Sequence, residues 1–326
     1  MSNTISVLIP TYKRPEKLKR AIESVLAQTY TDLKVIVCDN ASGDETAAVV
    51  DAIMQTDSRV EYFQHAQNIG MNGNFNFAIS KVETPFFTLL PDDDYQLPNY
   101  LQDAMQGFEI CPDVMFSILE APVINEGQEE NILNRQLAKW PKEGRYLPGE
   151  ALKLVSTGRH FVFTASVFKQ ELKSEMYFDE IVGNISDWPI MIALVAKYPF
   201  YLSKKAGLYF IRHPQAIGAN QNRDHFFRLE EVVRKKLCRD VNQANTALAY
   251  LEHNLNKFYL VYLLNRLRMN DEAGYSRVLK EIEKRRISVY KLVAMWVNWI
   301  VYIPGVKFCL RKCINSAVFI RNIIKS

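Results

Sequence analysis

Short apolar runs alternate with stretches of helical spacing over about the first 90 residues of the chain. The runs are rich in β-branched residues, which is typical of buried strands. The stretches between them place apolar side chains three and four residues apart, as in Leu18, Ile22 and Val25, which favours amphipathic helices. The pattern predicts strands at 5–10, 33–38, 60–64 and 86–90, and helices at 16–28, 45–54 and 75–80. This alternation predicts an α/β fold with a doubly wound, mostly parallel sheet.

Beyond residue 97 the pattern is less regular. Stretches with the length and apolar spacing of helices are 98–110, 190–197, 226–238, 242–267 and 271–285. Strand character recurs at 113–119, 159–168, 200–202 and 209–211. The polar stretch 125–142 is either a solvated excursion or an acceptor loop. Because no strand pattern follows residue 215, we expect a domain at 1–215 and a helical C-terminal region at 216–326.

Charge becomes informative when it is divided along the chain. The formal net charge is +4, but no acidic residue follows Glu283, so the last 43 residues carry +9 and the first 283 carry −5. The basic tail includes an apolar, aromatic stretch at 289–303, which is shorter than the roughly 20 residues that span a bilayer. Aromatic residues flanked by cations suit a membrane interface. We therefore expect peripheral membrane contact, with packing on the first domain or on a partner subunit as the alternative.

Other classes of protein fit the composition less well. The body is acidic and the basic tail is apolar, so nucleic-acid binding is not expected. The cysteines have no metal-ligand or CxxC spacing, which favours free thiols in a reducing compartment. They are Cys38, Cys111, Cys238, Cys309 and Cys313. The first apolar run is too short for a signal peptide, so we expect a cytoplasmic protein at the inner face of the membrane.

Polar residues follow three of the predicted strands. They are Thr11, Tyr12, Lys13 and Arg14 after the first, Asp39 and Asn40 after the second, and Asp92, Asp93 and Asp94 after the fourth. The carboxyl ends of parallel strands meet at one edge of a sheet, where ligands bind in such folds. Clustered carboxylates there suit a divalent cation and, through it, a phosphate. The alternative is that each polar residue only ends a strand or caps a helix.

The segments 5–14, 35–44 and 89–94 together resemble the family 2 glycosyltransferases of the GT-A fold, of the type that builds bacterial surface polysaccharides. The resemblance covers about 100 residues and continues more weakly to about residue 215. It implies that the first-strand segment and Asp39 hold the nucleobase, and that the Asp-rich segment binds ribose and a divalent metal, Mn²⁺ or Mg²⁺. The donor-binding residues it implies are Pro10, Thr11, Tyr12, Arg14, Asp39, Asn40, Asn68, Gly70 and Asp92.

The sequence departs from the family pattern at three places. Pro91 stands where members often have an acid, so the resemblance places the metal on Asp93, with Asp94 in support, although Asp94 is also the residue of the triplet most easily explained by structure alone. Asn74-Phe75-Asn76 replaces Ala-Arg-Asn, which removes a cation from this helix. Ser186 replaces a common Glu.

The third departure leaves Asp187 as the catalytic base that the resemblance implies. Asp187 precedes Pro189 and an apolar helix, so a helix N-cap is the alternative role. His213 stands in the Arg-His segment that ends the resemblance, where it would approach the metal or the diphosphate. A structural histidine is the alternative.

These observations predict a metal-dependent glycosyltransferase, and the family resemblance implies that it is inverting. Its donor would be a UDP- or dTDP-sugar and its acceptor a saccharide, lipid-linked if the tail contacts membrane, and it could form a homo-oligomer. A sugar nucleotidyltransferase is one alternative, although 10–14 lacks the glycines of that class's first loop. A noncatalytic sugar- or partner-binding protein on the same fold is the other.

Overall fold

The computed structural model describes residues 3–128, 130–135, 137–156, 161–212 and 228–237, together with Lys280. The chain divides into two compact units, residues 1–250 and 251–326, and the helices and strands given below all belong to the first. The predicted domain boundary at residue 215, the helices predicted beyond residue 238, the basic aromatic tail and His213 lie outside the described residues.

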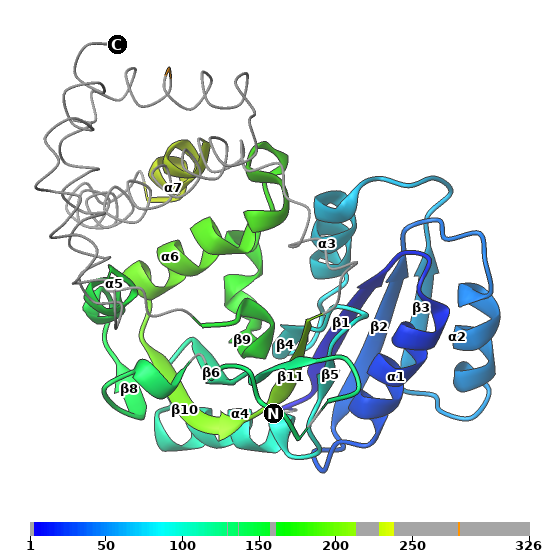
Figure 1. The fold of residues 1–326 in the computed structure, drawn as a ribbon, viewed down its shortest axis with the longest axis horizontal. Coiled ribbons are helices and arrows are strands. Elements are labelled where there is room, and N and C mark those ends of the chain that lie inside the picture. Colours follow the sequence, from blue (N-terminus) through cyan, green and yellow to red (C-terminus); the bar gives the residue numbers. More distant parts are fainter. Residues whose placement is uncertain are drawn as a thin grey trace, which may run out of the picture. The chain divides into compact units, whose positions relative to one another are not determined.

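Eight strands form the main sheet, in the order β3-β2-β1-β4-β9-β6-β10-β8 (Figure 1). They are β1 (Ile5–Thr11), β2 (Leu33–Asp39), β3 (Val60–Gln64), β4 (Phe86–Leu89), β6 (Phe116–Glu120), β8 (Gly144–Tyr146), β9 (Ser166–Lys169) and β10 (Phe200–Ala206). The pairs among β3, β2, β1 and β4 are parallel, as is β6 with β10, whereas β9 is antiparallel to both its neighbours and β8 to β10. The prediction of a mostly parallel sheet is confirmed.

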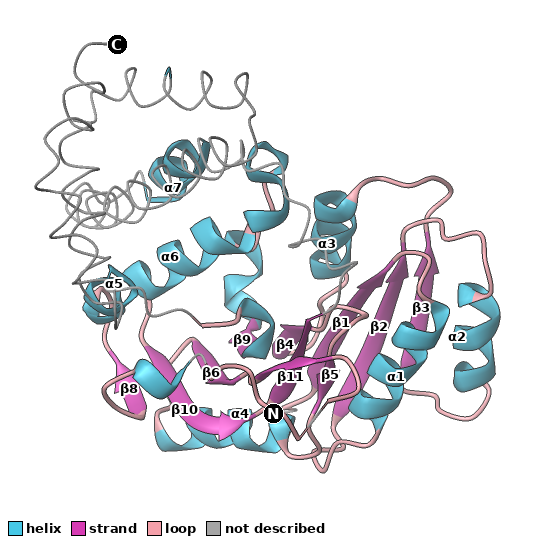
Figure 2. Ribbon diagram, viewed as in Figure 1, coloured by secondary structure: helices cyan, strands magenta, loops and turns pink. Residues whose placement is uncertain are grey.

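Helices cover both faces of this sheet (Figure 2). The α-helices are α1 (Pro15–Leu26), α2 (Thr46–Met54), α3 (Met71–Ser80), α4 (Tyr100–Ile110), α5 (Glu150–Ser156), α6 (Asp187–Lys197) and α7 (Leu229–Leu237). All seven residues of β1 are buried. Ile5, Val7 and Ile9 share one apolar cluster with residues of α1, α2 and α4, while α3 packs on β1 and β2 from the other face. The polar ends of β1 and β4 are left at the sheet's edge.

A small second sheet lies beside this edge. It consists of β5 (Tyr95–Gln96), β11 (Leu208–Arg212) and β7 (Val123–Asn125), in the order β5-β11-β7. Gly207 joins β10 to β11, and a Cβ atom there would come 2.5 Å from a ring carbon of Tyr100, so only glycine allows this close approach. Because β5 follows Asp94 directly, β11 is paired to the strand that leaves the acidic triplet.

Some predicted boundaries were wrong. The helix predicted to begin at Phe75 begins at Met71, because Gly70 with φ 80° starts it and Asn74 N–H donates to Gly70 O. Of the described residues 161–168, only the last three are in a strand, since the 3₁₀ helix η2 (Phe163–Ala165) precedes β9. The other 3₁₀ helices are η1 (Leu137–Lys139), η3 (Gln170–Glu175) and η4 (Glu180–Ile185). Among the described residues, none of the helices has the length and hydropathy needed to span a bilayer.

Candidate functional site

A cavity of about 500 Å³ lies at the carboxyl ends of β1 and β4, between them, α3 and the start of α6. Most of the predicted site residues line it together: Pro10, Thr11, Tyr12, Arg14, Asn40, Asn68, Asp92, Asp93, Asp94 and Asp187. The residues that meet here are up to 201 positions apart in sequence, from Pro10 to Ile211. The expected convergence of strand ends on one edge of the sheet is therefore present.

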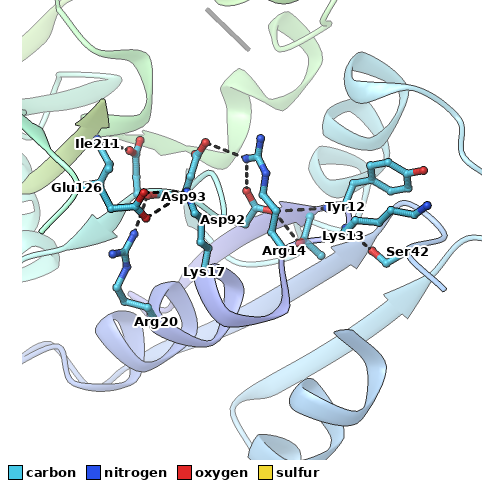
Figure 3. A network of polar contacts seen from close by, with 12 residues as sticks. Tyr12, Lys13, Arg14, Lys17, Arg20, Ser42, Asp92, Asp93, Glu126 and Ile211 are labelled. Carbon is cyan, nitrogen blue, oxygen red and sulfur yellow. Dashed lines mark hydrogen bonds and ion pairs between the residues drawn. The ribbon is translucent and has the colours of Figure 1, made fainter. Parts of the chain in front are cut away.

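Asp92 lines the cavity and has three hydrogen-bonding neighbours. Its carboxylate accepts hydrogen bonds from Thr11 Oγ1 at 2.7 Å and from Tyr12 N at 3.4 Å, and it pairs with Arg14 NH1 at 2.9 Å (Figure 3). Burial raises the pKa of Asp92, and the neighbouring Arg14 charge opposes that shift. Hydrogen bonds and an ion pair thus connect the segments that follow the first and fourth strands.

Asp93 is the most accessible acid of the triplet, with 18% of its side chain exposed. Its carboxylate pairs with the same Arg14 nitrogen at 2.8 Å. Its backbone carbonyl accepts a hydrogen bond from Arg20 NH2 at 3.0 Å, and the Arg20 guanidinium lies 4.9 Å from the centre of the Tyr95 ring. Two arginines of the α1 region therefore face this residue, one on its side chain and one on its backbone.

Asp94 is the most deeply buried acid of the triplet. It is 2% exposed and accepts the backbone N–H of Ile211 at 2.8 Å. Burial, followed by the charge of Asp93, raises the pKa of Asp94 well above its usual range. This contact attaches β11 to the triplet, which agrees with a structural role, and metal binding by Asp94 stays a prediction.

The acidic triplet fits a divalent cation that is shared with a substrate. Within the described part of the chain, no three acidic, histidine or cysteine side chains converge as a metal cage. However, one oxygen from Asp92 and one from Asp93 lie 2.9 and 2.8 Å from a single Arg14 nitrogen, so two carboxylates already meet at one cationic point. One or two carboxylates completed by substrate phosphates are the usual ligands of Mg²⁺. Asp93 and Asp92 would hold such an ion.

Asp39 does not line the cavity. It is fully buried and accepts hydrogen bonds from Ser42 N and Oγ, from Tyr62 Oη at 2.7 Å and from Gln64 Nε2 at 3.0 Å. These bonds fix the turn after β2 and attach it to β3. Nucleobase binding by Asp39 stays a prediction, and it would require one of these donors to move.

The loop that contains Asn68 and Gly70 is attached to the end of β2 by Asn40. The Asn40 amide donates to Asn68 Oδ1 and to Gly70 O, both at 3.1 Å, and its oxygen accepts the Ile69 N–H at 2.8 Å. Asn40 and Asn68 line the cavity, whereas Gly70 lies just behind them at the start of α3. The positive φ of Gly70 explains why a glycine stands at this position. Contact between Gly70 and the sugar donor stays a prediction.

Asp187 occupies the first position of α6 and lines the cavity. Ser186 holds the N-cap position. The alternative prediction, that Asp187 is the N-cap, is therefore wrong by one residue. Burial raises the pKa of the Asp187 carboxyl to about 6, although the backbone N–H groups of Trp188 and of Asp187 itself lower it. A carboxyl group with a pKa of about 6 is mostly ionised at physiological pH, so it can accept a proton.

Sequence reasoning missed three asparagines of α3 that support the site. Asn72 Nδ2 donates to Gly183 O at 2.9 Å and to Ser186 Oγ at 2.9 Å, directly before Asp187. Asn74 Nδ2 donates to Cys38 O at 2.8 Å, and Asn76 exchanges two hydrogen bonds with the backbone of Phe178. The helix thus connects the end of β2 to the turn that carries Asp187. Their clustering in 72–76, and the place of Asn74 and Asn76 at a family motif, were the signals available.

Arg20 and the aromatic wall of the cavity were also missed. Phe75, Phe163, Phe178, Trp188 and Phe210 all line it. In sequence these residues look like ordinary core side chains, and Phe163 and Phe178 are indeed buried. Phe210, by contrast, is 40% exposed, which only the path of β11 reveals. The cavity therefore combines one acidic end with an aromatic wall.

Comparison with known proteins identifies the family. The family model described as glycosyl transferase family 2 matches residues 6–172, about half of the chain and the whole acidic rim. The chain belongs to glycosyl transferase family 2. The resemblance stated from its motifs is thereby confirmed, and the protein is a glycosyltransferase.

The similarity of this family 2 enzyme to known proteins extends beyond residues 6–172. It is 28% identical over 325 residues to the GalNAc(5)-diNAcBac-PP-undecaprenol beta-1,3-glucosyltransferase of Campylobacter jejuni, covering 96% of this chain and 89% of that one. Among solved structures it resembles S. aureus TarS in complex with UDP, with a TM-score of 0.61, 16% identity and coverage of 86% and 91%. It also resembles the mannosyltransferase PcManGT of Pyrobaculum calidifontis in complex with GDP-Man and Mn²⁺, with a TM-score of 0.50, 14% identity and coverage of 92% and 81%. At these identities the two structures establish the fold.

Proposed function

We propose that this family 2 glycosyltransferase is metal-dependent and inverting, and that it moves a sugar from a UDP- or dTDP-linked donor to a hydroxyl group of a lipid-linked saccharide during surface polysaccharide synthesis. The observation that carries the proposal is the single cavity that Asp92, Asp93 and Asp187 line together. The two acids of the triplet suit a diphosphate with its cation, and Asp187 suits an acceptor hydroxyl.

In the proposed reaction the acceptor oxygen attacks the anomeric carbon of the donor sugar. Asp187 takes the hydroxyl proton as the new carbon–oxygen bond forms. The bond from the anomeric carbon to the diphosphate breaks with its electron pair on the leaving oxygen, so the nucleoside diphosphate departs as an anion. A divalent cation held by Asp93 would neutralise charge on this leaving group. One displacement inverts the anomeric configuration and needs no covalent intermediate.

The comparisons support the donor class and the metal only by analogy. TarS was solved with UDP and PcManGT with a GDP-sugar and Mn²⁺. In this chain Tyr12 is 40% exposed at the cavity, with Lys13 Nζ 5.3 Å from the centre of its ring. A ring this exposed can stack on a nucleobase. The proposed donor is therefore linked to either UDP or dTDP.

The acceptor proposal rests on the Campylobacter relative and on the sequence of the tail. That relative's name specifies a saccharide linked to undecaprenyl diphosphate. A lipid-linked acceptor is found at a membrane surface, and the basic, aromatic stretch near 289–303 suits such a surface. Peripheral contact with the inner face of the cell membrane is therefore part of the proposal.

Replacement of Asp187 by Asn tests the base. The variant keeps the size and polarity of the side chain but cannot accept the proton, so we expect transfer to fall at least 100-fold. Binding of UDP or dTDP with Mn²⁺, measured as a rise in melting temperature, should remain within about twofold of the wild type. Asp113→Asn, an exposed acid paired with Arg145 away from the cavity, is the matched control.

Two results would contradict the proposal. Unchanged transfer by the Asp187→Asn enzyme would remove this residue from the mechanism. Absence of any melting shift with UDP, dTDP or GDP would remove the nucleotide-donor assignment and would favour a noncatalytic binding role.

A further inference from the structure

Arg14 occupies the point at which two acids of the triplet converge. Its NH1 nitrogen lies 2.9 Å from Asp92 Oδ1 and 2.8 Å from Asp93 Oδ2 (Figure 3). One positively charged nitrogen thus binds one oxygen from each carboxylate. Without it, two neighbouring carboxylates, one of them almost fully buried, would face each other without a counter-charge at this point, which is strongly unfavourable.

A divalent ion and this guanidinium cannot occupy the same point. Mg²⁺ or a similar ion binds carboxylate oxygens at about 2.0–2.2 Å, which is closer than the Arg14 nitrogen and within the volume that it fills. We propose that Arg14 is an exchangeable counter-cation, which neutralises the Asp92–Asp93 pair in the absence of metal and leaves it when a divalent cation binds. The inference rests on the proposed function, because that function requires the cation.

The surroundings identify Arg14, and not Arg20, as the residue that moves. The Arg14 side chain is 24% exposed and lines the cavity, so it has open space to enter. Arg20 holds the Asp93 carbonyl and lies over the Tyr95 ring, and it is not among the cavity residues. Arg20 would therefore keep the backbone of the triplet in place while Arg14 leaves.

Asp92 is prepared for the exchange by its other partners. Thr11 Oγ1 and Tyr12 N still donate to it after Arg14 departs, so the carboxylate keeps its orientation. The Asp93 side chain is the more exposed of the two, at 18%, so its carboxylate can turn toward an incoming ion. The site thus has one fixed acid and one adjustable acid.

The exchange couples metal binding to donor binding. A displaced guanidinium in the cavity is available to a diphosphate, and Arg binds phosphate oxygens strongly. A diphosphate that holds Arg14 away from Asp93 favours the metal-bound arrangement, and by linkage the metal favours diphosphate binding by the same factor. Arg14 would then neutralise the two carboxylates before the metal binds and the diphosphate leaving group afterwards.

Calorimetric titration with Mn²⁺ alone tests the exchange. We expect Arg14→Met to bind Mn²⁺ at least tenfold more tightly than the wild type, because the ion no longer competes with a resident cation. The melting temperature of the metal-free variant should be lower than that of the wild type, and Mn²⁺ should raise it by more. Arg14→Gln, which keeps amide donors without charge, should show the same direction and serves if Arg14→Met does not fold.

Lys17→Met is the matched control, because Lys17 is a cation of α1 that pairs with Glu126 (Figure 3). Its Mn²⁺ affinity should stay within about twofold of the wild type. Equal or weaker Mn²⁺ binding by both Arg14 variants would overturn the exchange, as would an equal gain in Lys17→Met or the absence of Mn²⁺ binding in every protein. If UDP still raises the melting temperature in these cases, the exchange alone fails; loss of both responses means that the proposed function fails too.

Discussion

At the scale of single residues, Asp187 shows how one environment affects chemistry and stability in opposite ways. Its carboxyl lies at the start of α6, where backbone N–H groups favour the ionised form, yet burial dominates and brings the pKa to about 6. Such a group is mostly ionised at pH 7 and still basic enough to accept a proton. The same burial means that ionising Asp187 destabilises the folded chain.

The pH dependence of stability tests this description. The folded pKa of Asp187, about 6, is above its ordinary value of 3.8, so the unfavourable contribution is full above pH 6 and disappears as the pH falls toward 4. Asp187→Asn should therefore raise the free energy of unfolding at pH 7.5, by at most about 3 kcal/mol. In urea denaturation the difference between variant and wild type should shrink to near zero at pH 4. A difference that does not change with pH would contradict the raised pKa.

At the scale of elements, α3 shows where sequence pattern stops being informative. The four main strands around β1, the helices between them and the acidic rim were predictable, because buried apolar runs and polar strand ends are local signals. The first turn of α3 was not, since Asn72, Gly73 and Asn74 are poor helix formers. Their helical conformation is stabilised by contacts with Cys38, Gly183 and Ser186, which are distant in sequence. The accessible face of Phe210 and the position of Arg20 depend on such packing as well.

Asn76→Ala measures how much α3 contributes. The substitution removes hydrogen bonds of 2.9 and 2.8 Å to the carbonyl and N–H of Phe178 and leaves two backbone groups without these partners. We expect a loss of about 1–3 kcal/mol in the free energy of unfolding, measured as a lower urea midpoint with an unchanged slope. Ser80→Ala removes only a local bond to Phe77 O at the exposed end of the same helix and should change stability by less than about 0.5 kcal/mol. Equal effects of the two substitutions would show that the Asn76 pair contributes nothing specific.

At the scale of the whole molecule, the sequence separates an acidic body from a basic, aromatic tail. The cavity with its acids lies in the body, so a membrane contact made by the tail would leave the chemistry to the first unit. This division was visible in the charge distribution alone, whereas the tail lies outside the described residues.

Truncation after Arg286 tests the tail. Six of the nine basic residues that follow Glu283 are removed with the apolar stretch, and each basic residue near an anionic surface contributes about 1 kcal/mol to membrane binding. We expect the truncated protein to move from the membrane fraction to the supernatant, and to lose binding to vesicles that contain anionic lipid. Neutral vesicles and the full-length chain are the controls. Unaltered partitioning would refute the interfacial role.

The reversed strand β9 has a consequence for how the chain reaches its folded state. β1 to β4 pair among themselves, so half of the sheet can assemble as soon as about 90 residues have left the ribosome. β6 pairs with β9 and β10 and therefore must wait until residues 166–206 are synthesised, because β9 alone joins it to β4. Such long-range pairing closes slowly, and the exposed edge of β4 is open to wrong partners in the interval. The cavity of the candidate site, which Asp187 and Ile211 also line, is expected to be among the last features of the first unit to form.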